Sequence, residues 1–209
     1  SGYDMYADYV LKHRMASKVE NVYQLLNDLI AAYKPTAQEE KEALSEIAMR
    51  QEGADFVMEP WDTAYYSHQL QMEKYNLDAE MLRPYFKLEN VIKGVFGLAT
   101  RLYGITFKEN KDIPVYHPDV KAYEVSDRDG SYLAVLYADF FPRKGKQSGA
   151  WMTEFQGQWI DRKGNNVRPH ASLVMNFTKP TDDKPALLTL GEVETFLHEF
   201  GHSLHGMFA

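Results

Sequence analysis

The sequence carries its most informative pattern near its carboxyl end, in the stretch Thr189-Leu190-Gly191-Glu192-Val193-Glu194-Thr195-Phe196-Leu197-His198-Glu199-Phe200-Gly201-His202-Ser203-Leu204-His205. Thr189 and Glu192 are spaced as a capping box, in which each side chain accepts a hydrogen bond from the other residue's backbone N–H. The pair predicts a helix that begins at this point. Residues 198–202 of that helix read H-E-F-G-H and match the pattern H-E-x-x-H.

The spacing of His198 and His202 suits a metal ion. Residues four apart lie one turn apart on the same helical face, with about 5–6 Å between their Cβ atoms. Two imidazoles at this spacing can converge on one tetrahedral Zn²⁺, with bonds of about 2.0–2.1 Å. Glu199 projects in an adjacent direction, close to the metal without being a ligand. The pattern predicts a zinc site with two histidine ligands, and the alternative is a solvated helix face with structural histidines.

Two further side chains of this helix are candidates for supporting roles. His205 follows His202 by three residues and lies on a neighbouring face, where it can contact a ligand or line a substrate cleft. Glu194 lies one turn before His198 on the same face and can orient the imidazole or line the cleft. A structural or solvated role is the alternative for both. His170 precedes a predicted strand, and a role in the cleft is a weaker hypothesis.

Composition and charge exclude several classes of function. The 209 residues include 23 basic and 30 acidic side chains, which gives a net charge of −7, so nucleic acid is not expected as a partner. There is no cysteine, so a disulfide framework and a cysteine-based zinc site are both excluded. No apolar run approaches the length of about 18 residues that a membrane span needs, so no membrane partner is expected. Oligomeric state is not encoded in any pattern of the sequence.

The first half of the sequence has the pattern of a helical scaffold, which we assign to residues 1–104. Apolar residues recur at helical spacing, and capping boxes and prolines mark the ends of the segments. Four helices are predicted. The first runs from the box of Ser17 and Glu20 to Pro35, and the second runs from the box of Thr36 and Glu39 to near Gly53. The third spans 61–75 after Pro60, and the fourth spans 88–103 before Gly104.

The second half, residues 105–209, is predicted to hold a small β-sheet and the helix of the zinc motif. The turn 127–130 (DRDG) joins strand-like runs 120–126 and 131–140 and predicts a β-hairpin. Residues 132–137 are apolar on both faces, which predicts a central strand covered by helices. Further strands are predicted at 105–108 and 171–177. Residues 143–149 are predicted to be a polar loop, either a solvated connection or a mobile loop at a cleft.

The motif and several upstream segments together resemble the thimet oligopeptidase family of zinc peptidases. Residues 198–205 match the family pattern H-E-F-G-H-x-x-H. The resemblance covers the whole sequence and is most specific in its second half, where it resembles the bacterial peptidyl-dipeptidase (dipeptidyl carboxypeptidase) branch more than the oligopeptidase A branch. The other segments that carry it are 138–143 (ADFFPR), 149–152 (GAWM), 175–177 (MNF), 184–188 (KPALL) and 205–209 (HGMFA).

This resemblance implies a mainly α, zincin-like α+β fold, a two-lobed helical protein with a small antiparallel sheet beside the zinc helix. It implies one Zn²⁺, held by His198 and His202, with Glu199 as the general base. It also implies a channel that admits short peptides and excludes folded proteins, and hydrolysis that releases C-terminal dipeptides. We expect a bacterial, cytoplasmic protein, with export left open because the native amino terminus is not expected in this sequence.

The sequence departs from the family pattern in one respect. The family's third zinc ligand is a glutamate at a position beyond Ala209, and family members are several times longer. We therefore expect these residues to be an internal fragment of a longer protein, called the parent below. The parent is expected to hold the zinc and the activity, and the fragment alone is expected to be inactive because it lacks the third ligand.

Two other functions remain open from the sequence. One is an endo-acting oligopeptidase, which would cut within the peptide rather than release dipeptides. The other is a non-catalytic helical module in which the histidines bind no metal. For the catalytic interpretation, the strand 171–177 is the predicted edge that pairs with the substrate backbone, since it lies just before the zinc helix.

Overall fold

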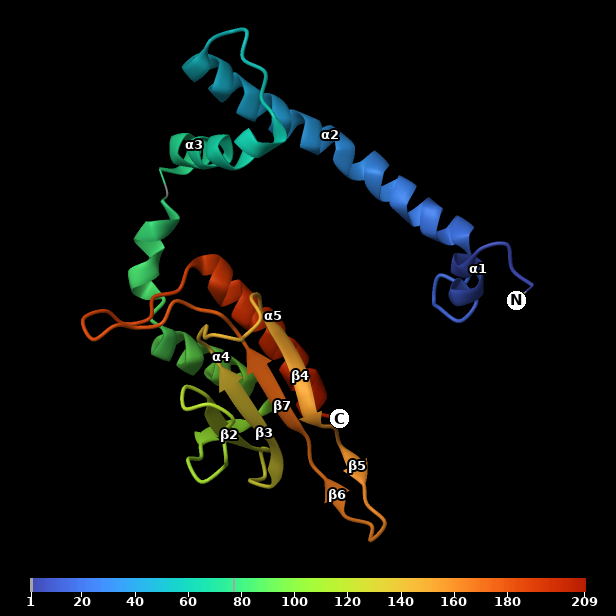
Figure 1. Ribbon diagram of the computed structural model, residues 1–209, viewed down its shortest axis with the longest axis vertical. Helices are drawn as coiled ribbons and strands as arrows, with labels where there is room; N and C mark the ends of the chain where they lie inside the picture. Colours follow the sequence, from blue (N-terminus) through green and yellow to red (C-terminus); the bar gives the residue numbers. More distant parts are fainter. Residues whose placement is uncertain (1, 77) are drawn as a thin grey trace. The chain divides into compact units, whose positions relative to one another are not determined.

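The computed structural model describes residues 2–76 and 78–209, and the chain divides into two compact units, Ser1–Leu77 and Asp78–Ala209 (Figure 1). The predicted fold class, mainly α with a small β-sheet, is confirmed. Among the described residues, no helix has the length and apolar character that crossing a membrane requires.

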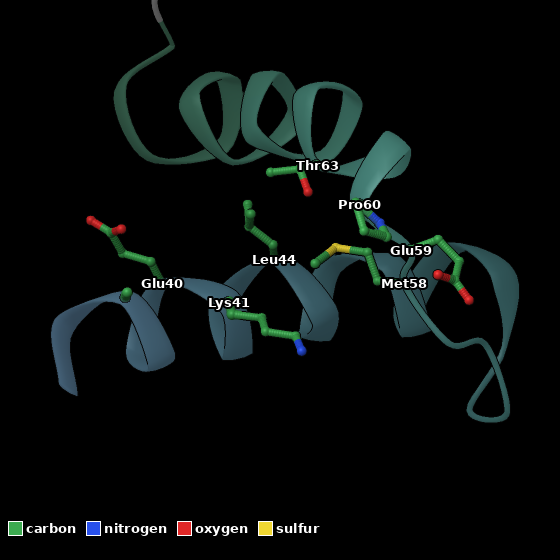
Figure 2. Close-up of a pocket in the computed structure, with 8 residues that line it drawn as sticks. Glu40, Lys41, Leu44, Met58, Glu59, Pro60 and Thr63 are labelled. Carbon is green, nitrogen blue, oxygen red and sulfur yellow. The ribbon is translucent and has the colours of Figure 1, made fainter. Parts of the chain in front are cut away.

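The first unit is entirely helical in its described part. It contains α1 (Tyr6–Leu11), the long α2 (Val19–Glu52), a 3₁₀ turn η1 (Pro60–Asp62) and α3 (Thr63–Tyr75). A small apolar core joins the end of α2 to α3; it is formed by Leu44, Ile47, Ala48 and Tyr66, with Phe56, Met58 and Leu70 packed against it. A cavity of about 370 Å³ lies beside this core, lined among others by Leu44, Met58, Pro60 and Thr63 (Figure 2).

Helix α2 corrects the prediction of two helices separated at Pro35. Pro35 lies inside the continuous helix. A proline there removes one backbone hydrogen bond, but the alanine, glutamine and glutamate residues around it are strong helix formers and extend the helix through it. The helix begins after Lys18, whose side chain makes no capping hydrogen bond, and Thr36 lies in the helix interior. Neither predicted capping box in this region is therefore formed.

The second unit is built around a five-stranded sheet with the order β1-β2-β3-β7-β4. Its strands are β1 (Thr106–Glu109), β2 (Lys121–Ser126), β3 (Tyr132–Asp139), β4 (Trp151–Gln156) and β7 (His170–Val174). The predicted hairpin is formed by β2 and β3, which pair antiparallel. A separate two-stranded ribbon, β5 (Trp159–Ile160) with β6 (Asn166–Val167), extends from the far end of β4 and was not predicted.

The sheet is mixed, whereas the resemblance implied an antiparallel one. β3 and β7 pair in parallel, while β4 pairs antiparallel with β7. The chain leaves β3, forms β4 and the ribbon, and returns to insert β7 between β3 and β4. This order corrects the prediction that strand 171–177 is an edge, because β7 has a partner on each side. The edge of the sheet on this side is β4.

Both faces of β3 are buried, as its apolar sequence predicts. Alternate residues of a strand face opposite sides, so Ala134, Leu136 and Ala138 join the main core with α4 (Leu88–Tyr103) and α5 (Leu190–Met207). On the other face, Val135 and Tyr137 pack with Val120, Ala122 and the loop residue Ile113. Among the described residues, helices cover one face of the sheet and the loop before β2 covers part of the other, so the predicted cover of helices is present on one face of β3.

The boundary between the two compact units precedes α4 along the chain. Val91, Val95 and Phe96 of α4 are buried in the main core against the sheet. The ring of Phe96 stacks on Phe107 of β1 with centroids 4.2 Å apart. α4 therefore belongs to the unit that carries the zinc motif. A further 3₁₀ segment, η2 (Ala79–Tyr85), precedes it.

Candidate metal centre

The helix of the motif, α5, begins as predicted from its capping box. The backbone N–H of Thr189 donates to Oε2 of Glu192 at 2.7 Å, and the N–H of Glu192 donates to Oγ1 of Thr189 at 3.1 Å. These bonds satisfy two of the free N–H groups that every helix start leaves. The capping box thereby fixes the residue at which the helix begins. It also fixes the direction in which each later side chain projects from the helix axis.

An apolar stripe anchors α5 to the sheet and turns the histidines outward. Phe196, Phe200 and Met207 are buried in the main core, and the Phe196 and Phe140 rings meet edge to face at 5.4 Å. His198 and His202 lie on the exposed side of the helix. In Figure 1, α5 runs alongside β4 and β7, the two strands with which it has its closest packing.

The two histidines converge at their Nε2 atoms. These atoms lie 3.2 Å apart, and the ring centroids lie 4.9 Å apart with the planes at 76°. Two ligand atoms on a tetrahedral Zn²⁺ with bonds of about 2.0–2.1 Å are about 3.3 Å apart. The separation of the Nε2 atoms of His198 and His202 is therefore compatible with two ligands of one zinc ion. Within residues 2–76 and 78–209, no group of three histidine, aspartate or glutamate side chains is arranged to hold a metal.

Glu199 and His202 line an open cavity between α5 and the edge strand β4. The cavity has a volume of about 430 Å³. Its full lining is Ala150, Trp151, Met152, Glu154, Glu199, His202, His205 and Gly206. One wall is thus the exposed strand and the other is the motif helix. The cavity beside α2, in the first unit, contains none of the candidate site residues predicted from the sequence.

The supporting residues predicted from the sequence have different positions. His205 lines the cavity. Glu194 is exposed on α5 and is not part of the cavity lining. His170 begins β7, where its Nδ1 lies 3.5 Å from the Tyr137 hydroxyl, and burial lowers the pKa of this imidazole. The structure does not bring His170 into the cavity.

Sequence reasoning missed a buried ionic cluster at the end of β3. Asp139 accepts two hydrogen bonds from Arg143, at 2.7 and 2.9 Å, and one from the Tyr116 hydroxyl at 3.0 Å. Lys146 donates to the same carboxylate at 2.9 Å. The Asp139 and Lys146 side chains are only 2% and 3% exposed. Residues 143–149, predicted as a polar loop, are therefore held to the sheet. The feature of the sequence that indicates such a cluster is an aspartate at the end of an otherwise apolar strand.

Glu154 of β4 was also missed. Its strand has no clear alternating pattern in the sequence, and its position opposite α5 depends on the return of β7 from a distant part of the chain. The structure places this carboxylate in the same cavity as Glu199 and His202.

Comparison with known proteins identifies a family that the whole chain matches. A family model described as peptidase family M3 matches residues 1–209. The chain belongs to this family. The resemblance to thimet oligopeptidases is thus confirmed, and with it the expectation of a metallopeptidase family.

Individual members of the M3 family are similar over the full chain. Dipeptidyl carboxypeptidase of Escherichia coli K12 is 41% identical over 210 residues, which cover 100% of this chain and 30% of that protein. Oligopeptidase A of the same organism is 39% identical over 206 residues, covering 99% of this chain and 30% of that protein. The organellar oligopeptidase A of Arabidopsis thaliana is 40% identical over 212 residues, covering 99% and 27%. The chain therefore spans about 30% of the length of these curated relatives.

Proposed function

We propose that the parent of these residues is a zinc-dependent peptidase that hydrolyses peptide bonds in short peptides. The observation that carries this proposal is the convergence of the His198 and His202 Nε2 atoms, 3.2 Å apart, beside Glu199 at the wall of an open cavity. Membership of peptidase family M3 supports it, and so do the relatives named as peptidases.

His198 and His202 would hold the Zn²⁺ through their Nε2 atoms, with a third ligand from the parent. Zinc in such a site polarises the substrate carbonyl and lowers the pKa of water, which makes water a nucleophile near neutral pH. Glu199 is the general base: its carboxylate accepts the proton from the attacking water and then delivers it to the leaving amine. Its place in the cavity wall, next to His202 and half-buried, agrees with this role.

The edge strand β4 is proposed to bind the substrate backbone, in place of β7. β7 pairs with β3 and β4 on its two sides, whereas β4 has a sheet partner on one side only among the described residues. An extended peptide added to such an edge is held by main-chain hydrogen bonds, which do not depend on the peptide's side chains. Ala150, just before β4, and Trp151, its first residue, line the same cavity as Glu199. A peptide on this edge would therefore pass beside the metal ligands.

Release of C-terminal dipeptides is the proposed mode of cleavage, and endo-acting cleavage is the alternative. The relatives include a dipeptidyl carboxypeptidase and oligopeptidases A with nearly equal identities, which do not separate the two modes. Product analysis on a neutral octapeptide distinguishes them. Successive dipeptides from the carboxyl end support the proposal, and a first cut in the interior of the peptide contradicts it.

The 209-residue chain by itself is proposed to be inactive. Two imidazoles supply only part of a catalytic zinc site, which has three protein ligands. Hydrolysis by the purified chain at a rate comparable with that of the parent would contradict this part of the proposal.

The substitution Glu199→Gln in the parent tests the assigned chemistry. It keeps the size of the side chain and removes the base, so the rate of hydrolysis is expected to fall by about 10²–10⁴. Zinc content, measured by elemental analysis, should stay unchanged because Glu199 is not a ligand. Unchanged hydrolysis in this variant would contradict the role of Glu199.

A further inference from the structure

We propose that Glu154 determines substrate specificity by binding a positively charged group of the substrate in the cavity beside the metal ligands. The inference rests on the proposed function, because it assigns a substrate class to the same cavity. The positive group is either a lysine or arginine side chain of the peptide or its free amino terminus, and both present the same cationic chemistry to a carboxylate.

The alternation of β4 places Glu154 on the face that the motif helix covers. Met152 and Glu154 line the cavity with Glu199 and His202. Thr153 and Phe155, the residues between and after them, line a different cavity on the opposite face of the sheet. The pairing of β4 with β7 is irregular between Glu154 and Gln156. Irregularities of this kind redirect side chains at sheet edges and are frequent beside active sites.

The motif helix makes room for this carboxylate. A Cβ atom on Gly206 would overlap Oε1 of Glu154 and come within 2.7 Å of Cε of Met152. Glycine at this position lets the carboxylate lie against the backbone of α5, one turn after His202. The apolar neighbour Met152 shows that this face of β4 also accepts an uncharged side chain. The packing of this face therefore does not by itself require a carboxylate at position 154.

The charges of the cavity leave Glu154 without a cation. The lining contains the carboxylates of Glu154 and Glu199 and no lysine or arginine. Neither carboxylate takes part in an ion pair in the part of the chain that the structure describes. Glu199 is assigned to proton transfer, so Glu154 is the carboxylate that remains for recognition. A cation that enters the cavity with the substrate would form a charge-assisted hydrogen bond to it.

The test compares matched peptides on the parent and on its Glu154→Gln variant. A neutral octapeptide with a free carboxyl end is made with one lysine at each position in turn, and each peptide is paired with its acetyl-lysine counterpart. A second pair has a free or an acetylated amino terminus. The control variant Asp183→Asn removes an exposed carboxylate from a turn outside the cavity. For each pair, the ratio of the two kcat/KM values is the preference for the cation.

We expect the parent and the control to prefer the cationic peptide by about two- to fivefold at one position of the lysine or at the amino terminus, as an ion pair with an exposed carboxylate provides. Glu154→Gln should reduce this ratio to about one, whereas Asp183→Asn should keep the ratio of the parent. Gly206→Ala, whose Cβ takes the place of the carboxylate, should reduce the same ratio. The pair that shows the preference identifies the bound cation: a lysine pair indicates a side chain, and the amino-terminal pair indicates the free amino terminus.

A preference in the parent that survives in Glu154→Gln would overturn the inference, and so would a parent that prefers neither cation. The same pairs are also measured by calorimetric binding on a Glu199→Gln background, where cleavage is removed. Binding that favours the cation and depends on Glu154 supports the inference even if no peptide is hydrolysed. In that case the proposed function fails and the assignment of the cation site stands.

Discussion

The ammonium group of Lys146 lies 2.9 Å from Oδ1 of Asp139, and both side chains are buried at the end of β3. Lys146 also donates to the carbonyl oxygens of Asp139, Phe141 and Met175, so it joins the ends of β3 and β7 to the loop that follows. Asn176 donates to the carbonyl oxygens of Gln147 and Gly149 from the other side of that loop. The loop leads directly into β4, so this network positions the strand that forms one wall of the proposed active site.

Lys146→Met in the parent is expected to lower the free energy of unfolding by about 3 kcal/mol. Removing one partner leaves a buried carboxylate with less compensation, and the effect lies at the lower end of the usual range of about 3–5 kcal/mol because Arg143 still pairs with Asp139. Urea unfolding provides the measurement. Lys144→Met is the matched control, since Lys144 is an exposed residue of the same loop and its loss should change stability by less than about 0.5 kcal/mol. Equal effects of the two substitutions would contradict this account.

The carboxylate of Asp139 should make stability depend on pH in the acid range. Burial by itself raises the pKa of this group, but hydrogen bonds from Arg143, Lys146 and Tyr116 outweigh it and hold the pKa below its usual value. A group with a lowered pKa in the folded state contributes stability above its unfolded pKa, and this contribution is lost as the pH falls through the folded pKa. The stability difference between the parent and its Asp139→Asn variant should therefore be constant near neutral pH and shrink below the ordinary value of 3.8. A difference that stays constant down to pH 2 would show that the carboxylate is not stabilised in this way.

Phe196→Ala should destabilise the parent through the core under the motif helix. Phe196 is completely buried and contacts the rings of Phe140, Phe177 and Phe200. Removal of a buried phenylalanine side chain costs about 3–5 kcal/mol because a cavity remains. Leu197→Ala is the control: this neighbouring apolar residue is 40% exposed, and its truncation should cost less than about 1 kcal/mol. Thermal and urea unfolding measure both, and a smaller loss for Phe196 than for Leu197 would contradict the packing described for α5.

The parts of the fold that the sequence predicts are those set by local interactions. The capping box of Thr189 and Glu192 fixes the start of α5, and the spacing of His198 and His202 alone brings their rings together. The hairpin of β2 and β3 follows from the turn at residues 127–130 in the same way. In each case the partners belong to one helix or to two consecutive strands, so nearby residues contain the necessary information.

The features that the sequence does not predict depend on distant partners. The edge position of β4 arises because β7, from later in the chain, inserts between β3 and β4. The burial of Lys146 in a loop that has a polar sequence depends on contacts with Asp139, the last residue of β3, and with Met175, which directly follows β7. The recognition carboxylate Glu154 belongs to the same group, since only the assembled cavity shows what it faces.

The central claim, that His198 and His202 hold a zinc ion, is tested most directly by zinc per chain. Elemental analysis would be made after dialysis against a mild chelator, on the parent and on its His198→Ala, His202→Ala and His205→Ala variants. We predict one zinc per chain in the parent and in His205→Ala, since His205 lines the cavity without being a ligand. We predict almost none in the other two, because each has lost one of the two converging Nε2 atoms. A full complement of zinc in His198→Ala or His202→Ala, or its absence from the folded parent, would contradict the claim.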